Sequence, residues 1–199
     1  METKIAEPER PSARERLLAA AEKLFYEEGV NTVGIDRIIE RAGVAKASLY
    51  STFGSKDELI RAYLARRHTA RKTRIEKKLA LCASPRERLL AVFDVLGELI
   101  AEPGFRGCAF LRASAEARSN SSVRGVCNDS RGWLRTLLRD LAEESGAADP
   151  EQLAQQLVLL YDGVSVSAQM DHNLGAAVAA RAVAEKMLEA QISRSPARE

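Results

Sequence analysis

The stretch Ile35–Lys56, IDRIIERAGVAKASLYSTFGSK, decides how the chain as a whole is interpreted. Gly43 stands where a helix ends in a left-handed residue, and Val44 then returns to the interior. The residues Ala45–Phe53 predict a second short helix with Leu49 and Phe53 turned inward. The helix before the glycine is indicated by apolar residues at the spacing of one helical face: Ile35, Ile38, Ile39 and Ala42.

Two short helices joined by a tight glycine turn form a helix-turn-helix, and the second helix of such a unit can lie in the major groove of DNA. The outer face of Ala45–Phe53 carries small, hydroxylic or cationic residues, which leave room for a base edge or a phosphate: Lys46, Ala47, Ser48, Tyr50, Ser51 and Thr52. The pattern therefore predicts a DNA-binding helix.

The longer segment GVNTVGIDRIIERAGVAKASLYSTFGSKDELI resembles the N-terminal signature of the TetR/AcrR transcriptional regulators. That signature runs AGV-x-K-x-[ST]-LY-x-x-F and then GSK-x-x-L, and the match covers about the first third of the chain. Gly34, Ile39 and Ala45 depart from it, since the family usually has Ser or Thr, Ala, and Ser at these positions. Gly is a tolerable N-cap and Ala a poor one, so both short helices are expected to lack a side-chain cap.

The resemblance implies roles at DNA for individual residues. It places Lys46, Ala47, Ser48 and Ser51 at base edges or nearby phosphates, and it places Arg37, Tyr50, Thr52 and Lys56 at phosphates. Lysine can reach guanine O6 and N7, and alanine can contact a thymine methyl. For Tyr50, packing of the ring is the structural alternative, and we expect ring packing and a hydroxyl–phosphate bond together. Asp36 faces the same region, where it reads a cytosine amino group or pairs with a neighbouring arginine.

Composition indicates an all-α protein with two parts. Of 199 residues 46% are hydrophobic and 29% charged, aromatics are few, and alternating strand patterns are nearly absent. We expect a flexible tail over 1–11 and a three-helix DNA-binding domain over 12–55. A larger helical bundle over 56–192 is expected to bind ligand and to dimerise; it begins with a linking helix over 56–82 and is followed by a frayed tail over 193–199.

Charge and cysteine content narrow the class further. Residues 1–78 hold 17 Lys and Arg against 12 Asp and Glu, a net +5, whereas residues 79–199 hold 13 against 16, a net −3. The basic run over 66–78 is expected to be a solvated face, with long-range attraction to DNA as the alternative. No signal peptide or membrane span is recognisable, and Cys82, Cys108 and Cys127 have no paired spacing, which favours a cytoplasmic protein with reduced thiols.

The two last predicted helices suggest a homodimer. The helix after Pro150 is apolar nearly all round and the final helix is rich in alanine, so each has more apolar surface than one core requires. We expect these helices and their symmetry mates to form a four-helix bundle. Burial of both faces within one subunit is the alternative. The residues expected at the interface are Val164, Ala168, Val178, Ala179, Ala182 and Val183.

A ligand pocket is expected among the central helices, where aromatic and apolar residues recur at helical spacing with a few polar groups between them. Plain core packing is the alternative for each of these residues. Asp162 is the most informative, because buried acids are rare unless they are paired. The candidates are Phe93, Leu96, Phe110, Glu116, Trp133, Leu137, Tyr161, Asp162, Ser165 and Gln169.

Catalytic and metal chemistry find little support. The Glu-x-x-His pattern of di-iron bundles is absent, since Ala65 and Gln169 precede the two histidines, His68 and His172, by three residues. We expect no catalytic residue, metal or cofactor. The sequence instead predicts a ligand-responsive repressor that binds a palindromic DNA operator as a dimer through Ala45–Phe53 and is released by a small apolar or amphipathic effector. The alternative is a helical ligand-binding or protein-interaction module that no longer engages DNA.

Overall fold

A computed structural model describes residues 11–117 and 121–192 of the chain. Over these residues every regular element is a helix and there is no strand, which confirms the predicted all-α class. The tails predicted over 1–11 and 193–199 lie, apart from Pro11, outside the described residues. The helices are α1 (Ala13–Glu28), α2 (Ile35–Ala42), α3 (Lys46–Phe53), α4 (Lys56–Leu79), α5 (Pro85–Ile100), α6 (Ala109–Glu116), α7 (Ser122–Glu144), α8 (Pro150–Met170) and α9 (Ala176–Ile192).

Local signals set the ends of these helices. Ser12 begins α1 with a complete capping box, in which its hydroxyl accepts from the Glu15 backbone N at 3.2 Å and the Glu15 carboxylate accepts from the Ser12 backbone. Gly34 and Ala45 precede α2 and α3 without a side-chain hydrogen bond, as expected. Gly43 ends α2 with a φ of 60°, a conformation that glycine adopts without a steric cost.

Two hydrophobic clusters organise the interior. The first joins α1–α3 to the N-terminal half of α4, and residues Ala109, Ala113, Val123 and Cys127 of α6 and α7 complete it. The second unites the C-terminal half of α4 with α5, α7, α8 and α9. The small N-terminal unit therefore completes its core against later parts of the chain, as expected for a three-helix unit too small to be stable alone.

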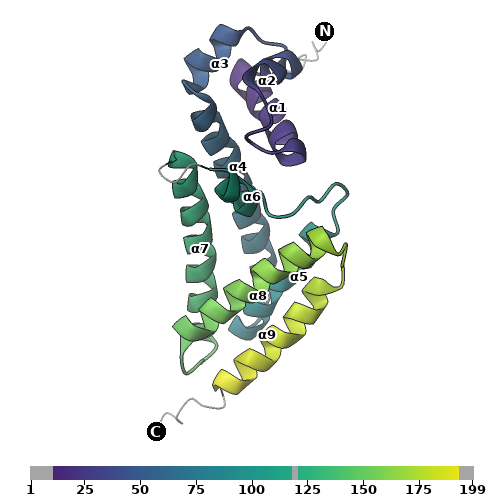
Figure 1. The fold of residues 1–199 in the computed structure, drawn as a ribbon. Helices are drawn as coiled ribbons and strands as arrows, with labels where there is room; N and C mark the ends of the chain where they lie inside the picture. The colour runs from purple at the N-terminus through teal and green to yellow at the C-terminus, as the bar shows by residue number, and fades with distance from the viewer. Residues whose placement is uncertain (1–10, 118–120, 193–199) are drawn as a thin grey trace, which may run out of the picture.

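The helix α4 belongs to both clusters, with Leu59 and Leu64 in the first and Ile75 in the second. In Figure 1 it runs from the α1–α3 unit into the bundle that α8 and α9 close from the other side. A continuous helix in both cores is a rigid connection between them, so displacement of one of its ends is transmitted to the other.

Candidate nucleic-acid interface and central cavity

The helix α3 is held by one buried residue and presents the rest of its surface outward. Leu49 is fully buried in the N-terminal cluster, and Phe53 packs against it partly buried. Every residue predicted to face DNA from this helix is exposed except Ser48, which is half-buried: Lys46, Ala47, Tyr50, Ser51 and Thr52. Tyr50 is 46% exposed, so the expected packing of its ring is at most partial, and the side chain remains accessible to a phosphate.

Two of the cationic residues predicted to contact DNA already form ion pairs within the protein. Lys46 Nζ donates to Asp36 Oδ1 at 2.9 Å, and this hydrogen bond raises the pKa of Lys46. The expected partner of Asp36 is an arginine or a cytosine, and its partner is instead this lysine. Arg37 donates from Nη2 to Glu28 Oε1 at 2.9 Å. Both pairs are exposed, and exposed pairs contribute little stability, so a phosphate can replace either carboxylate.

The hydroxyls of α3 have local partners. Ser51 Oγ donates to the Ser48 carbonyl oxygen at 3.2 Å, and Thr52 Oγ1 donates to the same oxygen at 2.6 Å. Each hydroxyl keeps its acceptor lone pairs free and can rotate to donate to a phosphate. Lys56 lies in the first turn of α4, where partial burial lowers its pKa.

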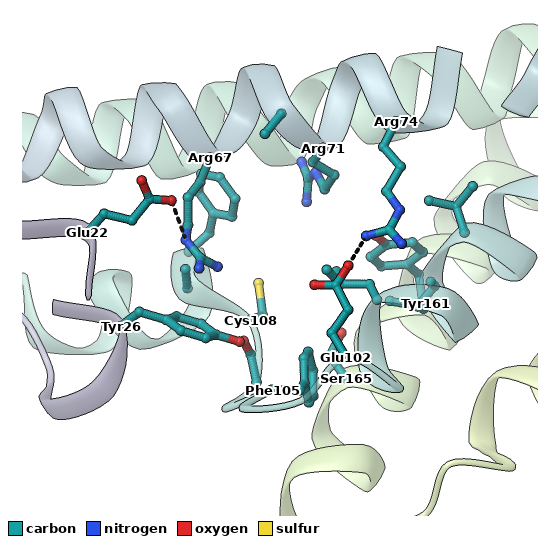
Figure 2. A pocket seen from close by; sticks show the side chains of 17 residues that line it. Glu22, Tyr26, Arg67, Arg71, Arg74, Glu102, Phe105, Cys108, Tyr161 and Ser165 are labelled. Atoms are coloured by element: carbon teal, nitrogen blue, oxygen red, sulfur yellow. Dashed lines mark hydrogen bonds and ion pairs between the residues drawn. The ribbon is translucent and has the colours of Figure 1, made fainter. Parts of the chain in front are cut away.

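A cavity of about 230 Å³ lies where α1, α4, α5, α6 and α8 meet. Figure 2 shows Arg67, Arg71 and Arg74 of α4 along one side of it and Tyr26, Phe105 and Cys108 across from them. Four residues predicted to line a ligand pocket do line it: Leu96, Phe110, Tyr161 and Ser165. A second cavity, of about 120 Å³, adjoins it and includes Asp162.

Five other pocket candidates lie elsewhere. Phe93 is fully buried core, and Leu137 packs against the same core cluster. Trp133 meets the His68 ring edge to face, with centroids 5.4 Å apart. The two remaining residues, Glu116 and Gln169, contact Asn31 and Gly107 respectively.

Asp162 is only half-buried and is paired with Arg131 in the second cavity. The partner that the sequence required for this acid is thus present within the subunit.

Comparisons with known proteins agree with this geometry. The model of the family "Bacterial regulatory proteins, tetR family" matches residues 17–63, and that of the "BetI-type transcriptional repressor, C-terminal" matches residues 85–193. The chain belongs to the TetR family of transcriptional regulators. A TetR-family regulator from Streptomyces coelicolor superposes with a TM-score of 0.86 at 31% identity, covering 90% of this chain and 96% of that one.

Two curated relatives illustrate the range of the family. The HTH-type transcriptional repressor NemR of Escherichia coli is 28% identical over 80% of this chain and 85% of its own length. The HTH-type transcriptional activator FasR of Mycolicibacterium smegmatis is 35% identical over 46% of this chain, and the match spans only 42% of FasR. This TetR-family chain is accordingly a DNA-binding regulator of transcription.

Sequence reasoning missed a row of arginines in this TetR-family cavity. Arg67, Arg71 and Arg74 line it from α4, although the basic run over 66–78 predicts a solvated face. Their spacing of four and three residues places them on one side of the helix, which was a usable signal. The neighbours Lys72 and Lys77 do not line either of the two cavities described above.

The cavity also touches the joint between the two parts of this TetR-family chain. Tyr26 of α1 donates from its hydroxyl to the Gly107 carbonyl at 3.2 Å and accepts from the Arg106 backbone N at 2.9 Å. Glu116 of α6 accepts from the Asn31 backbone N at 2.8 Å. The loop between α5 and α6, which lines the cavity, and α6 itself are therefore hydrogen-bonded to the DNA-binding unit.

The surface of α8 and α9 corrects part of the predicted dimer interface. Val164 and Ala168 are buried in the subunit's own core, which α8 shares with α5, α7 and α9. Val178, Ala179, Ala182 and Val183 are exposed on α9 as expected. On α8 the outward stripe is instead Leu159, Val166 and Met170. We call these exposed residues of α8 and α9 the α8–α9 face.

Two features associated with other protein classes are missing from the described residues. No helix there is long and apolar enough to cross a membrane. No group of three or more His, Cys, Asp or Glu side chains in that part of the chain is placed to hold a metal ion.

Proposed function

We propose that this protein is a ligand-responsive repressor that acts on chromosomal DNA in the cytoplasm. A DNA-binding unit over residues 12–55 reads a palindromic operator through α3, and residues 56–192 bind the effector and dimerise. The observation that carries the proposal is the exposed face of α3, where a lysine, small residues and hydroxyls surround the single buried anchor Leu49. Such a face can reach base edges in a major groove.

Dimerisation through the α8–α9 face supplies the second recognition helix. Val178 is 73% exposed and Met170 74% exposed, although both are large apolar residues. Several large apolar side chains exposed on two neighbouring helices favour an interaction surface there. Two copies related by a two-fold axis form a four-helix bundle there and direct their α3 helices to half-sites about 34–36 Å apart.

Effector binding in the central cavity changes the separation of the two α3 helices. A ligand shifts such an equilibrium only by its differential affinity for the two states. The cavity is lined by Tyr26 of the DNA-binding unit and by Arg71 of the continuous helix α4, so a guest that moves either side chain acts directly on the connection. Repression ends when the ligand-bound state no longer fits two successive grooves.

Fluorescence anisotropy with duplexes from upstream of the protein's own gene tests the proposal. Binding should weaken with salt in proportion to the number of phosphates contacted. Tyr50→Ala and Lys56→Ala should weaken binding to all duplexes, and Lys56→Ala should lower the salt slope by about one. Lys46→Ala and Ser48→Ala should change sequence preference. If no duplex binds in a salt-dependent way, the chain is instead a helical binding module that does not engage DNA.

A further inference from the structure

The arginines of the central cavity outnumber the acids that face them. Arg67 lies with Nε 3.7 Å from Glu22 Oε1, and Arg74 is paired with Glu102. The lining holds these three guanidinium groups and two carboxylates, so one positive charge remains. Figure 2 shows Arg71 between the other two, without an interaction to any acid drawn there.

Arg71 has only neutral partners among the described residues. Its Nη2 donates to the Ser130 carbonyl at 3.0 Å and to Ser130 Oγ at 2.8 Å. Its guanidinium also lies over the ring of Phe110, 5.0 Å from the centroid. Its Nε is buried without a hydrogen-bond partner, and no carboxylate of the described residues forms an ion pair with it. Arg71 is partly buried, and a guanidinium taken out of water is ordinarily paired, so both its charge and its buried Nε donor call for an anion.

The geometry and charge of the unpaired Arg71 guanidinium indicate which kind of anion fits it. Guanidinium groups present a planar fork of donors that matches a carboxylate, and such charge-assisted bonds are stronger than neutral ones. A single unpaired cation balances one negative charge, which favours a monoanion over a dianionic phosphate. Burial raises the pKa of Tyr161, so its phenol stays protonated beside the same cavity and can donate a hydrogen bond.

The rest of the cavity suits a hydrocarbon. Large apolar side chains line it from α5, from the loop between α5 and α6, and from α6: Val95, Leu96, Leu99, Phe105 and Phe110. The smaller cavity shares Arg71, Cys108, Phe110 and Tyr161 with it, and the two volumes of about 230 and 120 Å³ add up to roughly 350 Å³. This sum lies at the small end of the usual range for ligand pockets, about 300–1,000 Å³.

We propose that the effector is a small amphipathic organic acid, with its carboxylate on Arg71 and its hydrocarbon part among the apolar residues of the cavity wall. The inference rests on the proposed function only in that the bound acid is taken to regulate DNA binding. Binding of the acid itself can be measured without DNA. A cationic ligand of the same size is repelled by the excess positive charge of the cavity lining, so its binding is disfavoured. A neutral amide fills the same volume but leaves Arg71 unpaired.

Intrinsic fluorescence provides the test, because Trp133 is the only tryptophan of the chain and its ring centroid lies 5.7 Å from the Arg71 guanidinium. The full-length protein is titrated with hexanoate, octanoate, decanoate and dodecanoate, and with octanamide and octylammonium as matched probes. At least one acid should bind saturably, and octanamide should bind about tenfold or more weakly than octanoate. Octylammonium should bind less well than either.

Variants separate recognition from folding. Arg71→Gln should lower octanoate affinity by about tenfold or more and bring the octanoate-to-octanamide ratio close to one, a change that loss of packing alone does not cause. Lys77→Gln, on an exposed position of the same helix outside both cavities, should leave both affinities unchanged. A thermal melt of each variant checks that the fold is retained.

The outcomes are distinct. If no acid binds, if octanamide binds as well as octanoate, or if octylammonium binds best, the inference is wrong. If an acid binds through Arg71 but leaves operator affinity unchanged in the anisotropy assay, the cavity inference stands and ligand-responsive repression fails. If the protein binds no DNA at all, the proposed function fails while the titration still decides the inference.

Discussion

Truncation of Leu159 to alanine should break the proposed dimer while leaving the subunit folded. Leu159 lies on α8 in the α8–α9 face, and 68% of its surface remains exposed in the single subunit. Full burial of a leucine side chain contributes about 1.5–3 kcal/mol. About two-thirds of that is still available on association, roughly 1–2 kcal/mol for each copy.

Two-fold symmetry doubles the effect, because the substitution occurs in both subunits. The dimer should lose about 2–4 kcal/mol, which at 1.4 kcal/mol per factor of ten corresponds to a dissociation constant raised roughly 30-fold to 700-fold. This is an upper range, since alanine retains the Cβ atom. Sedimentation velocity over a concentration series measures the dissociation constant of the dimer directly.

Leu111→Ala is the matched control. Leu111 is 52% exposed on α6, outside the α8–α9 face, and its truncation should leave the dimer unchanged. DNA affinity of Leu159→Ala should fall together with the dimer population. An unchanged dissociation constant for Leu159→Ala, or an equal effect of Leu111→Ala, would refute the assignment of this face.

Three further predictions concern stability and reactivity. Ser84 forms a complete capping box with Glu87 at the start of α5, so Ser84→Ala should cost about 1 kcal/mol and lower Tm by roughly 2–4 °C; an unchanged melt contradicts this. Burial, and then the nearby Arg71 and Lys72, lower the pKa of His68 below its ordinary 6.5, against a smaller opposing effect of Asp129. The unfolded chain then binds the proton more readily, so the free energy of unfolding should fall as pH drops below about 6.5, and His68→Gln should flatten that decline in denaturant titrations. Burial raises the pKa of Cys127 to about 11, so alkylation at pH 8, followed by mass spectrometry, should modify Cys82 and Cys108 before Cys127; early labelling of Cys127 contradicts its burial.

The fold was accessible from the sequence because its determinants are local. Ser12 and Ser84 mark the starts of α1 and α5 through capping hydrogen bonds to residues only three positions later. Gly43 ends α2 by its own backbone conformation. The burial of Leu49 follows from the helical spacing of apolar residues. Once Leu49 is known to face inward, the residues exposed on α3 can be inferred from the sequence alone.

The cavity was harder to predict because periodicity identifies one side of a helix but not its neighbour. Phe93 and Trp133 are on inward faces, yet they meet core and His68 instead of the cavity. Arg71 lies in a basic run that is typical of a solvated face; its spacing shows which side of α4 it occupies, and only the position of α5 and α8 makes that side a cavity wall.

The α8 residues expected at the dimer interface are misplaced for a related reason. Because the sequence of α8 is apolar nearly all round, it does not reveal which side of the helix packs into the subunit's own core. Val164 is buried there, whereas Leu159 is exposed.

Selection from a pool of randomised duplexes tests most directly whether α3 reads DNA as one half of a two-fold pair. The wild-type protein should enrich an inverted repeat whose half-sites are centred one helical turn, or a multiple of it, apart, and Leu159→Ala should enrich it poorly. Enrichment of a single unrepeated site, or of no site at all, would contradict the account.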